Sequence, residues 1–223
     1  MRKWIWIAGA ILGLVVVVIA IGGWMLYRAS RQVPEFYRKA LVADPAAQAK
    51  ASNAMLQKTS DLVSDVEREG RWQALFTAEE INGWLAVDLV NNHPGAIPAG
   101  VVDPRVAIRP QQLTLACRID RDDLSGVLSL TVEPYMPEPN VIAVRVRSVR
   151  LGALPLPLGQ ILDSVSDASR QMHLRLQWQQ AEGDPVALIS TAPPRDQDDR
   201  VVRIESLRLG EGEVYISGTT QRR

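Results

Sequence analysis

The chain of 223 residues offers few side chains for acid-base or nucleophilic chemistry. It contains two histidines, His93 in a loop rich in proline and glycine and His173 at an expected helix-strand junction. No metalloprotease, nucleophile-elbow or phosphate-loop motif accompanies them in the sequence. We therefore expect a protein that is not an enzyme and that uses no cofactor.

Two acidic clusters have a spacing that could offer oxygen ligands to calcium. They are DRDD at 120–123 and DQDD at 196–199. Neither continues into the glycine and distal glutamate of an EF-hand loop. Because turns select aspartate for conformational reasons, we expect solvated turns here and no metal site.

Glu79 and Glu80 could suggest a general acid-base pair, but adjacent helical residues do not face each other. The sequence from Thr77 to Glu80 instead has the form of a capping box, in which each side chain bonds the other residue's backbone. The single cysteine, Cys117, alternates with apolar residues, so we expect it to be buried and not reactive. One cysteine also excludes an intramolecular disulfide.

The elements that would carry any site follow an apolar run at 4–26, WIWIAGAILGLVVVVIAIGGWML, which contains no charged residue. A helix of that length spans roughly 35 Å and can cross a bilayer. A cleaved secretory signal would have a shorter apolar region and a small-residue cleavage site. We therefore expect a tail at 1–3, a single membrane anchor at 4–26, a juxtamembrane segment at 27–44 and one extracytoplasmic domain at 45–223.

The basic side chains of Arg2 and Lys3 favour a cytoplasmic amino terminus, and hence an exported domain in a cell membrane. These two account for part of the 25 basic residues, so 23 remain against 25 acidic ones beyond the tail. A nucleic-acid binder would show clustered Lys and Arg on one face. We expect the membrane as partner and no nucleic acid; the sequence names no protein partner.

Helical periodicity precedes strand periodicity along the domain. A helix is expected to begin at Pro45, with an apolar stripe that packs on its own domain, formed by Met55, Leu56, Thr59, Leu62, Val63 and Val66. A strand at 72–76 leads into a second helix with Ile81, Trp84, Leu85 and Leu89 on one side. Beyond residue 100, apolar residues alternate along successive strands, which is typical of an antiparallel sheet.

Two strands lose one step of this alternation, after Val146 and after Ile204, as a β-bulge would cause. A third amphipathic helix is expected near 158–168, with Leu158, Ile161, Leu162, Val165 and Ala168 at helical spacing. The predicted fold class is α+β, with a curved antiparallel sheet packed against amphipathic helices.

The stretch DLSGVLSLTVEPYMPEPNVIAVRVRSVRLGALPLPLGQILDSV at 123–165, with TAEEINGWL at 77–85, resembles small membrane-anchored bacterial proteins of the YpmS type. It is more distantly similar to the LmeA type. The resemblance implies a one-module relative of the tubular lipid-binding (TULIP) superfamily, in which a curved sheet wraps a long helix and leaves an apolar groove. It implies no catalytic motif.

Two classes of function remain open. The first is a module that binds a lipid or another apolar ligand in a groove, with these candidate lining residues: Trp84, Leu85, Leu89, Leu154, Leu156, Leu158, Ile161 and Leu162. The second is a tethered protein-interaction or envelope-scaffold domain. The same residues could also simply fill a closed core.

Overall fold

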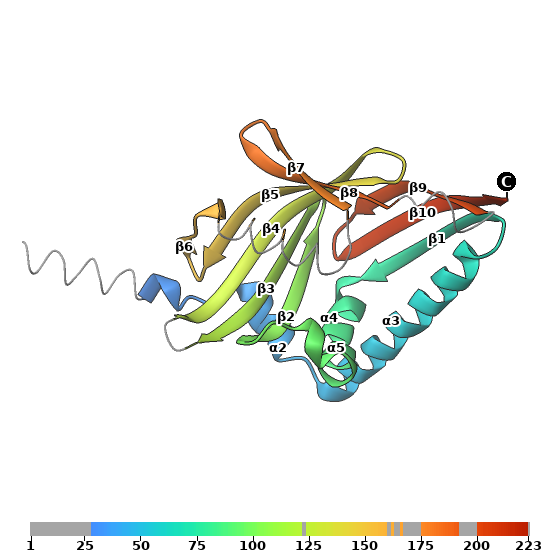
Figure 1. Ribbon diagram of the computed structural model, residues 1–223. Helices are drawn as coiled ribbons and strands as arrows, with labels where there is room; N and C mark the ends of the chain where they lie inside the picture. Colours follow the sequence, from blue (N-terminus) through green and yellow to red (C-terminus); the bar gives the residue numbers. More distant parts are fainter. Residues whose placement is uncertain are drawn as a thin grey trace, which may run out of the picture.

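The computed structural model describes residues 28–121, 124–159, 162, 166, 175–191 and 200–222 (Figure 1). The expected tail at 1–3 and anchor at 4–26 lie outside these residues. Among the described residues, no helix is both long enough and apolar enough to span a membrane. The fold is α+β and its strands pair antiparallel, as the alternation predicts.

The strands form two sheets, where a single one was expected. The small sheet has the order β1-β10-β9 and consists of β1 (Gly70–Thr77), β9 (Arg200–Leu209) and β10 (Glu213–Arg222). The large sheet has the order β2-β3-β4-β5-β8-β7, with β6 paired to β5. Its strands are β2 (Val101–Arg109), β3 (Gln112–Arg121), β4 (Leu124–Glu138), β5 (Val141–Leu151), β6 (Leu154–Pro155), β7 (Arg175–Ala181) and β8 (Asp184–Ser190).

The helices precede most of the strands. Those with both ends among the described residues are α2 (Glu35–Leu41), α3 (Pro45–Val66), α4 (Ala78–Ala86), α5 (Asp88–Asn92) and the 3₁₀ turn η1 (Pro94–Ala96). α3 begins as predicted, with Pro45 at its start and the Asp44 carboxylate accepting from the Ala47 amide at 3.1 Å. The second predicted helix is divided into α4 and α5, because Val87 leaves regular helical geometry at φ −113° and ψ −66°.

Both predicted β-bulges are present. In the pairing of β4 with β5, Thr131 faces Ser148 and Val132 faces Val146, so Arg147 is the extra residue. In the pairing of β10 with β9, Ser217 faces Ser206 and Gly218 faces Ile204. An unpaired residue of this kind bends a strand and increases its twist, which returns the apolar side chains to one face after each break.

An asparagine side chain joins the two sheets. Asn140, in the turn between β4 and β5, donates from Nδ2 to the Val202 carbonyl at 3.0 Å. Its Oδ1 accepts from the Ile204 amide at 2.6 Å, and the Asn140 amide donates to the Ile204 carbonyl. The Asn140 side-chain amide thus pairs with β9 as a neighbouring strand would. The small sheet therefore lies beside the large sheet (Figure 1).

A second asparagine covers the outer edge of β2. Asn82 of α4 donates from Nδ2 to the Val106 carbonyl at 2.9 Å and accepts at Oδ1 from the Val106 amide at 2.7 Å. An unpaired strand edge invites pairing with another chain, so this contact both protects the edge and fixes α4 against the large sheet.

Replacing Asn82 with alanine should lower the free energy of unfolding by about 2 kcal/mol, because both backbone groups of Val106 lose their partner. Urea unfolding of the full chain in detergent, followed by circular dichroism, measures this loss. Asn53→Ala, at an exposed position of α3, is the matched control and should unfold as the parent does. Equal stability of both variants would contradict the role of Asn82.

Hydrogen bonds fix the start of α4 and connect it to α3. The predicted capping box is present: the Glu80 amide donates to Thr77 Oγ1 at 3.2 Å, and the Thr77 amide donates to Glu80 Oε2 at 2.9 Å. Lys58 of α3 also donates to Glu80 and to the Leu75 carbonyl, each at 3.0 Å. Burial alone would raise the pKa of Glu80, but hydrogen bonds from Lys58 and Thr77 outweigh it and lower this pKa. Glu80 therefore has the structural role that its capping position predicts.

Apolar side chains pack on both faces of the large sheet: a small cluster of Tyr37, Ala116 and Val127 lies on one face, and the larger core lies on the other. Val132, Val146 and Val149 are its buried centre. Around them pack Leu113, Leu128, Leu130, Val144, Leu156, Leu158, Leu162 and Trp178. Of the third predicted helix, Leu158, Leu162 and Ser166 are helical, and Ile161, Val165 and Ala168 lie outside the described residues. Ser166 accepts from the Trp178 indole at 2.8 Å, which fixes this helix above β7.

Candidate functional site

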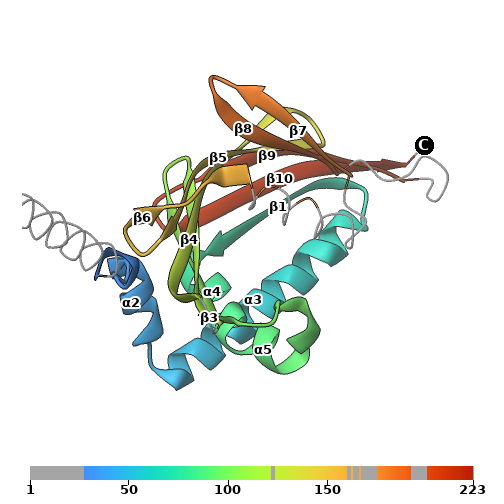
Figure 2. The same ribbon diagram turned by 60° about the vertical axis from the view of Figure 1, so that its left-hand side comes forward.

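An apolar groove of about 460 Å³ lies between the second half of α3 and the small sheet. Figure 2 shows α3 running along β1. Leu62, Val63 and Val66 of α3 form one wall of the groove, and the opposite wall comes from Trp72, Val202, Ile204 and Ile216. A volume of this size falls within the roughly 300 to 1,000 Å³ of small-molecule sites.

Strand register explains why this face of the small sheet is apolar. Trp72 faces Gly218 across β1 and β10, and Ala74 faces Ile216 two residues further on. Gly218 in turn faces Ile204 of β9. Because side chains alternate between the two faces of a strand, these residues share one face. The sheet therefore offers α3 an apolar surface over all three strands.

A buried chain of hydrogen bonds fixes the end of α3 beside the groove. The Trp72 indole donates to Thr220 Oγ1 at 3.2 Å, and this hydroxyl donates to the Val66 carbonyl in the last turn of α3 at 2.8 Å. Thr220 is 1% exposed and Trp72 is 5% exposed. Gly218 lies directly beneath the Trp72 ring, where any Cβ would collide with the indole. Glycine at 218 thus leaves room for the indole beside β10.

The groove is open along one side. Val63 remains 53% exposed although it lines the groove, while Leu62 and Val66 are half-buried. The predicted stripe of α3 therefore packs on the small sheet only in part. Glu67 and Arg200 also line the groove, and Arg200 donates to the Glu67 carbonyl at 3.0 Å. An apolar interior with polar groups at one end suits an amphiphilic ligand.

The structure separates the site residues predicted from sequence into two places. Leu156, Leu158 and Leu162 come together on the apolar face of the large sheet. Leu154 lies in β6 opposite Leu151, half-buried, and Ile161 lies outside the described residues.

The other predicted lining residues belong to α4 and α5. Trp84, Leu85 and Leu89 are half-buried, and the Trp84 ring lies 6.2 Å from that of His93 between centroids. Within the part of the chain that the structure describes, these three residues are not members of the buried cluster of the large sheet.

Sequence reasoning did not assign the groove to α3 and the small sheet. A signal was present, since the stripe with Leu62, Val63 and Val66 was recognised, as was the alternation of Val202 with Ile204. Nothing local indicates that these two segments face each other, because they are more than 130 positions apart.

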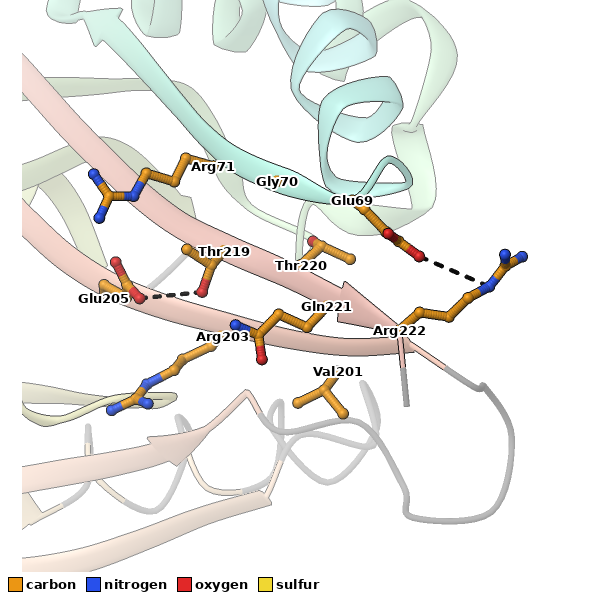
Figure 3. Close-up of a pocket in the computed structure, with 10 residues that line it drawn as sticks. All are labelled: Glu69, Gly70, Arg71, Val201, Arg203, Glu205, Thr219, Thr220, Gln221 and Arg222. Carbon is orange, nitrogen blue, oxygen red and sulfur yellow. Dashed lines mark hydrogen bonds and ion pairs between the residues drawn. The ribbon is translucent and has the colours of Figure 1, made fainter.

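A larger hollow of about 870 Å³ lies on the opposite, polar face of the small sheet (Figure 3). Glutamates lie among its arginines: Glu205 accepts from Thr219 at 3.1 Å, and the Arg222 guanidinium lies 3.9 Å from the Glu69 carboxylate. Because side chains of both charges line this hollow, it offers no field of one sign to a ligand.

The residues with chemical potential are dispersed. His93 Nε2 lies 3.4 Å from the buried Asp88 carboxylate. Cys117 is half-buried and not fully buried as predicted, and its partial burial raises the pKa of the thiol, which keeps it protonated at neutral pH. No group of three or more metal-binding side chains occurs within the described ranges. His173, residues 122–123 of the first acidic cluster and the whole second cluster at 196–199 lie outside these ranges.

No family model, curated protein or solved structure matches this chain. The expected relationship to YpmS-type and LmeA-type proteins therefore stays a prediction.

Proposed function

We propose that this protein is held in a cell membrane by residues 4–26 and binds a lipid or another apolar ligand with its extracytoplasmic domain. The observation that carries the proposal is the open apolar groove between α3 and the small sheet. A closed core would bury its wall, yet Val63 is half exposed. The proposed protein is not an enzyme; it holds or passes its ligand beside the bilayer.

We further propose that the architecture is a small variant of the tubular lipid-binding fold. A bulged and therefore bent sheet supports this assignment, as does a long helix lying along one of its faces (Figure 2). In this variant the acyl chain would lie along α3. The residues predicted around Leu158 and Trp84 would then be supporting core.

A photoreactive lipid tests the groove directly. The full chain is placed in phosphatidylcholine nanodiscs that contain a phospholipid with a diazirine near the end of one acyl chain. After irradiation, peptide mass spectrometry should find adducts on the groove walls at α3, β1 and β9, in addition to those on 4–26. Adducts confined to 4–26 would contradict ligand binding.

Val63→Asp should reduce the groove adducts about tenfold, because the variant places a carboxylate in the apolar wall. The half-exposed position should tolerate the change without unfolding. Val90→Asp on α5, where valine is 47% exposed, is the matched control and should keep the adducts. Equal adducts in the two variants would show that the groove is not the site.

A tethered protein-interaction or scaffold domain is the second candidate. Leu56 and Val63 favour it, because they lie seven residues apart on α3 and are 42% and 53% exposed. A protein partner would protect both residues from hydroxyl-radical labelling in cells. An acyl chain in the groove would protect Val63 and leave Leu56 labelled.

A further inference from the structure

A separate cleft of about 540 Å³ lies on the other face of the large sheet, beside the small cluster of Tyr37, Ala116 and Val127 and away from the apolar groove. Its floor is a row of small side chains across four adjacent strands. Ala107 pairs with Thr114, Thr114 with Thr131, and Thr131 with Ser148. The hollow exists because these side chains are short, and three of the four present hydroxyl groups.

The charge in this cleft has one sign. Arg109 and Arg150 line it, and none of the described residues around it is acidic. The ion pairs of the large sheet lie elsewhere, for example Arg147 with Glu133 at 2.8 Å. This differs from the polar hollow of the small sheet, where glutamates lie beside the arginines. The cleft therefore offers two cations and several hydroxyls to an anionic ligand.

The cleft opens beside the chain that leaves the apolar run. Gln32, Val33, Pro34 and Phe36 line one wall. The Ala153 amide donates to the Ala29 carbonyl at 2.9 Å, which holds this segment on the turn after β5. Gly152 is required there, at φ +58°, because a Cβ would press on the Ala29 and Ser30 carbonyls.

The short segment between residue 26 and Gln32 limits the distance between the cleft and the apolar run at 4–26. Gln32 is six positions beyond residue 26, and six extended residues reach at most about 20 Å. If 4–26 spans a bilayer, the wall of the cleft lies at or near the headgroup layer.

We infer that this cleft binds the headgroup of an anionic phospholipid, whose phosphate pairs with arginine and whose hydroxyls bond the threonine and serine row. β2 and β5 are three strand spacings apart, about 14 Å, and the register also sets Arg109 and Arg150 four residues, about 13 Å, apart along the strands. The two arginines therefore lie at diagonally opposite corners of the hollow. An extended headgroup of phosphate and polyol fits this spacing better than a lone phosphate ion. The inference rests on the membrane tether of the proposed function, but not on its apolar groove.

Native mass spectrometry tests it with the full chain in nanodiscs of equal phosphatidylglycerol and phosphatidylcholine. Among the lipids that stay bound after ejection from the disc, phosphatidylglycerol should exceed phosphatidylcholine by about tenfold. The double variant Arg109→Gln with Arg150→Gln should return this ratio to that of the disc. Both arginines are exposed, so the fold should persist, which circular dichroism verifies.

The control pair Arg71→Gln with Arg203→Gln removes the same charge from the small sheet and should leave the preference intact. Val63→Asp should also keep it, which separates failure of the cleft from failure of the groove. Loss of preference in the control pair, or no preference in the parent, would overturn the inference. A separate measurement follows the ³¹P line width of inorganic phosphate. Broadening that depends on Arg109 and Arg150, together with no lipid preference, would also overturn the inference, because the ligand would then be free phosphate.

Discussion

Replacing Gly83 with valine should separate α3 from α4 and lower the free energy of unfolding by about 3 kcal/mol or more. A Cβ at residue 83 would lie 2.6 Å from the Ala51 Cβ, 2.7 Å from the Ser52 nitrogen and 2.8 Å from the Gln48 oxygen. Two of these contacts are with backbone atoms of α3, which cannot rotate away. The helix as a whole must move to make room.

Displacing α3 also moves one wall of the groove, so Gly83→Val should lose groove adducts together with stability. Thermal unfolding of the full chain in detergent, followed by circular dichroism, measures the first effect. Gly95→Val is the matched control, because nothing lies within 4 Å of a Cβ at that exposed position. A melting curve for Gly83→Val that coincides with the parent would show that α3 does not depend on this close contact.

Thr220→Val has the second large expected effect, a loss of about 3 kcal/mol. Valine has nearly the shape of threonine but no hydroxyl, so it leaves the Trp72 indole N–H and the Val66 carbonyl without their present partner. Each buried polar group that loses its partner costs about 1 to 3 kcal/mol. The last turn of α3, no longer held by this hydrogen bond, should then separate from the small sheet beside the groove.

Two further variants separate the hydroxyl from the rest of the side chain. Thr220→Ser keeps both hydrogen bonds and should lose only about 1 kcal/mol from the missing methyl group. Thr219→Val, one residue earlier, faces the opposite side of the sheet, where its hydroxyl donates to Glu205 in an exposed contact, and should change little. Urea midpoints rank the three variants. Equal losses from valine and serine at 220 would contradict the hydrogen-bond explanation.

Together the two positions explain how α3 forms a groove instead of a closed core. Gly83 brings its first half against α4, and Thr220 fixes its last turn to the small sheet. Between these two fixed positions α3 lies over the small sheet, and the exposed side chain of Val63 marks the open side of the groove. Both predictions therefore concern stability and ligand binding at once.

Local signals in the sequence predicted the elements well. The capping box at Thr77 and Glu80, the start of α3 at Pro45 and the two bulges all act within a few residues. Hydrogen bonds to nearby amides and the alternation of side chains along a strand need no distant partner. The α+β class and the antiparallel pairing follow from the same signals.

The site could not be derived in this way. Leu158, which packs on the core of the large sheet, has the same apolar character as Leu62, which lines the groove, so composition alone cannot tell a core residue from a groove residue. Asn82 and Asn140 appear in the sequence as an ordinary helical residue and a turn residue. Their pairing with the edges of β2 and β9 depends on segments that are distant along the chain.

The sequence by itself determined the individual helices and strands, the apolar run at 4–26 and the scarcity of catalytic side chains. Only the tertiary structure decided that β1 joins β10 and β9, that α3 lies over their apolar face, and that a polar cleft opens beside residues 32–36. The reason is that strands of equal alternation can pair in many orders with similar local energy. Long-range packing, such as Gly83 against Ala51 and Thr220 against Val66, selects one of them.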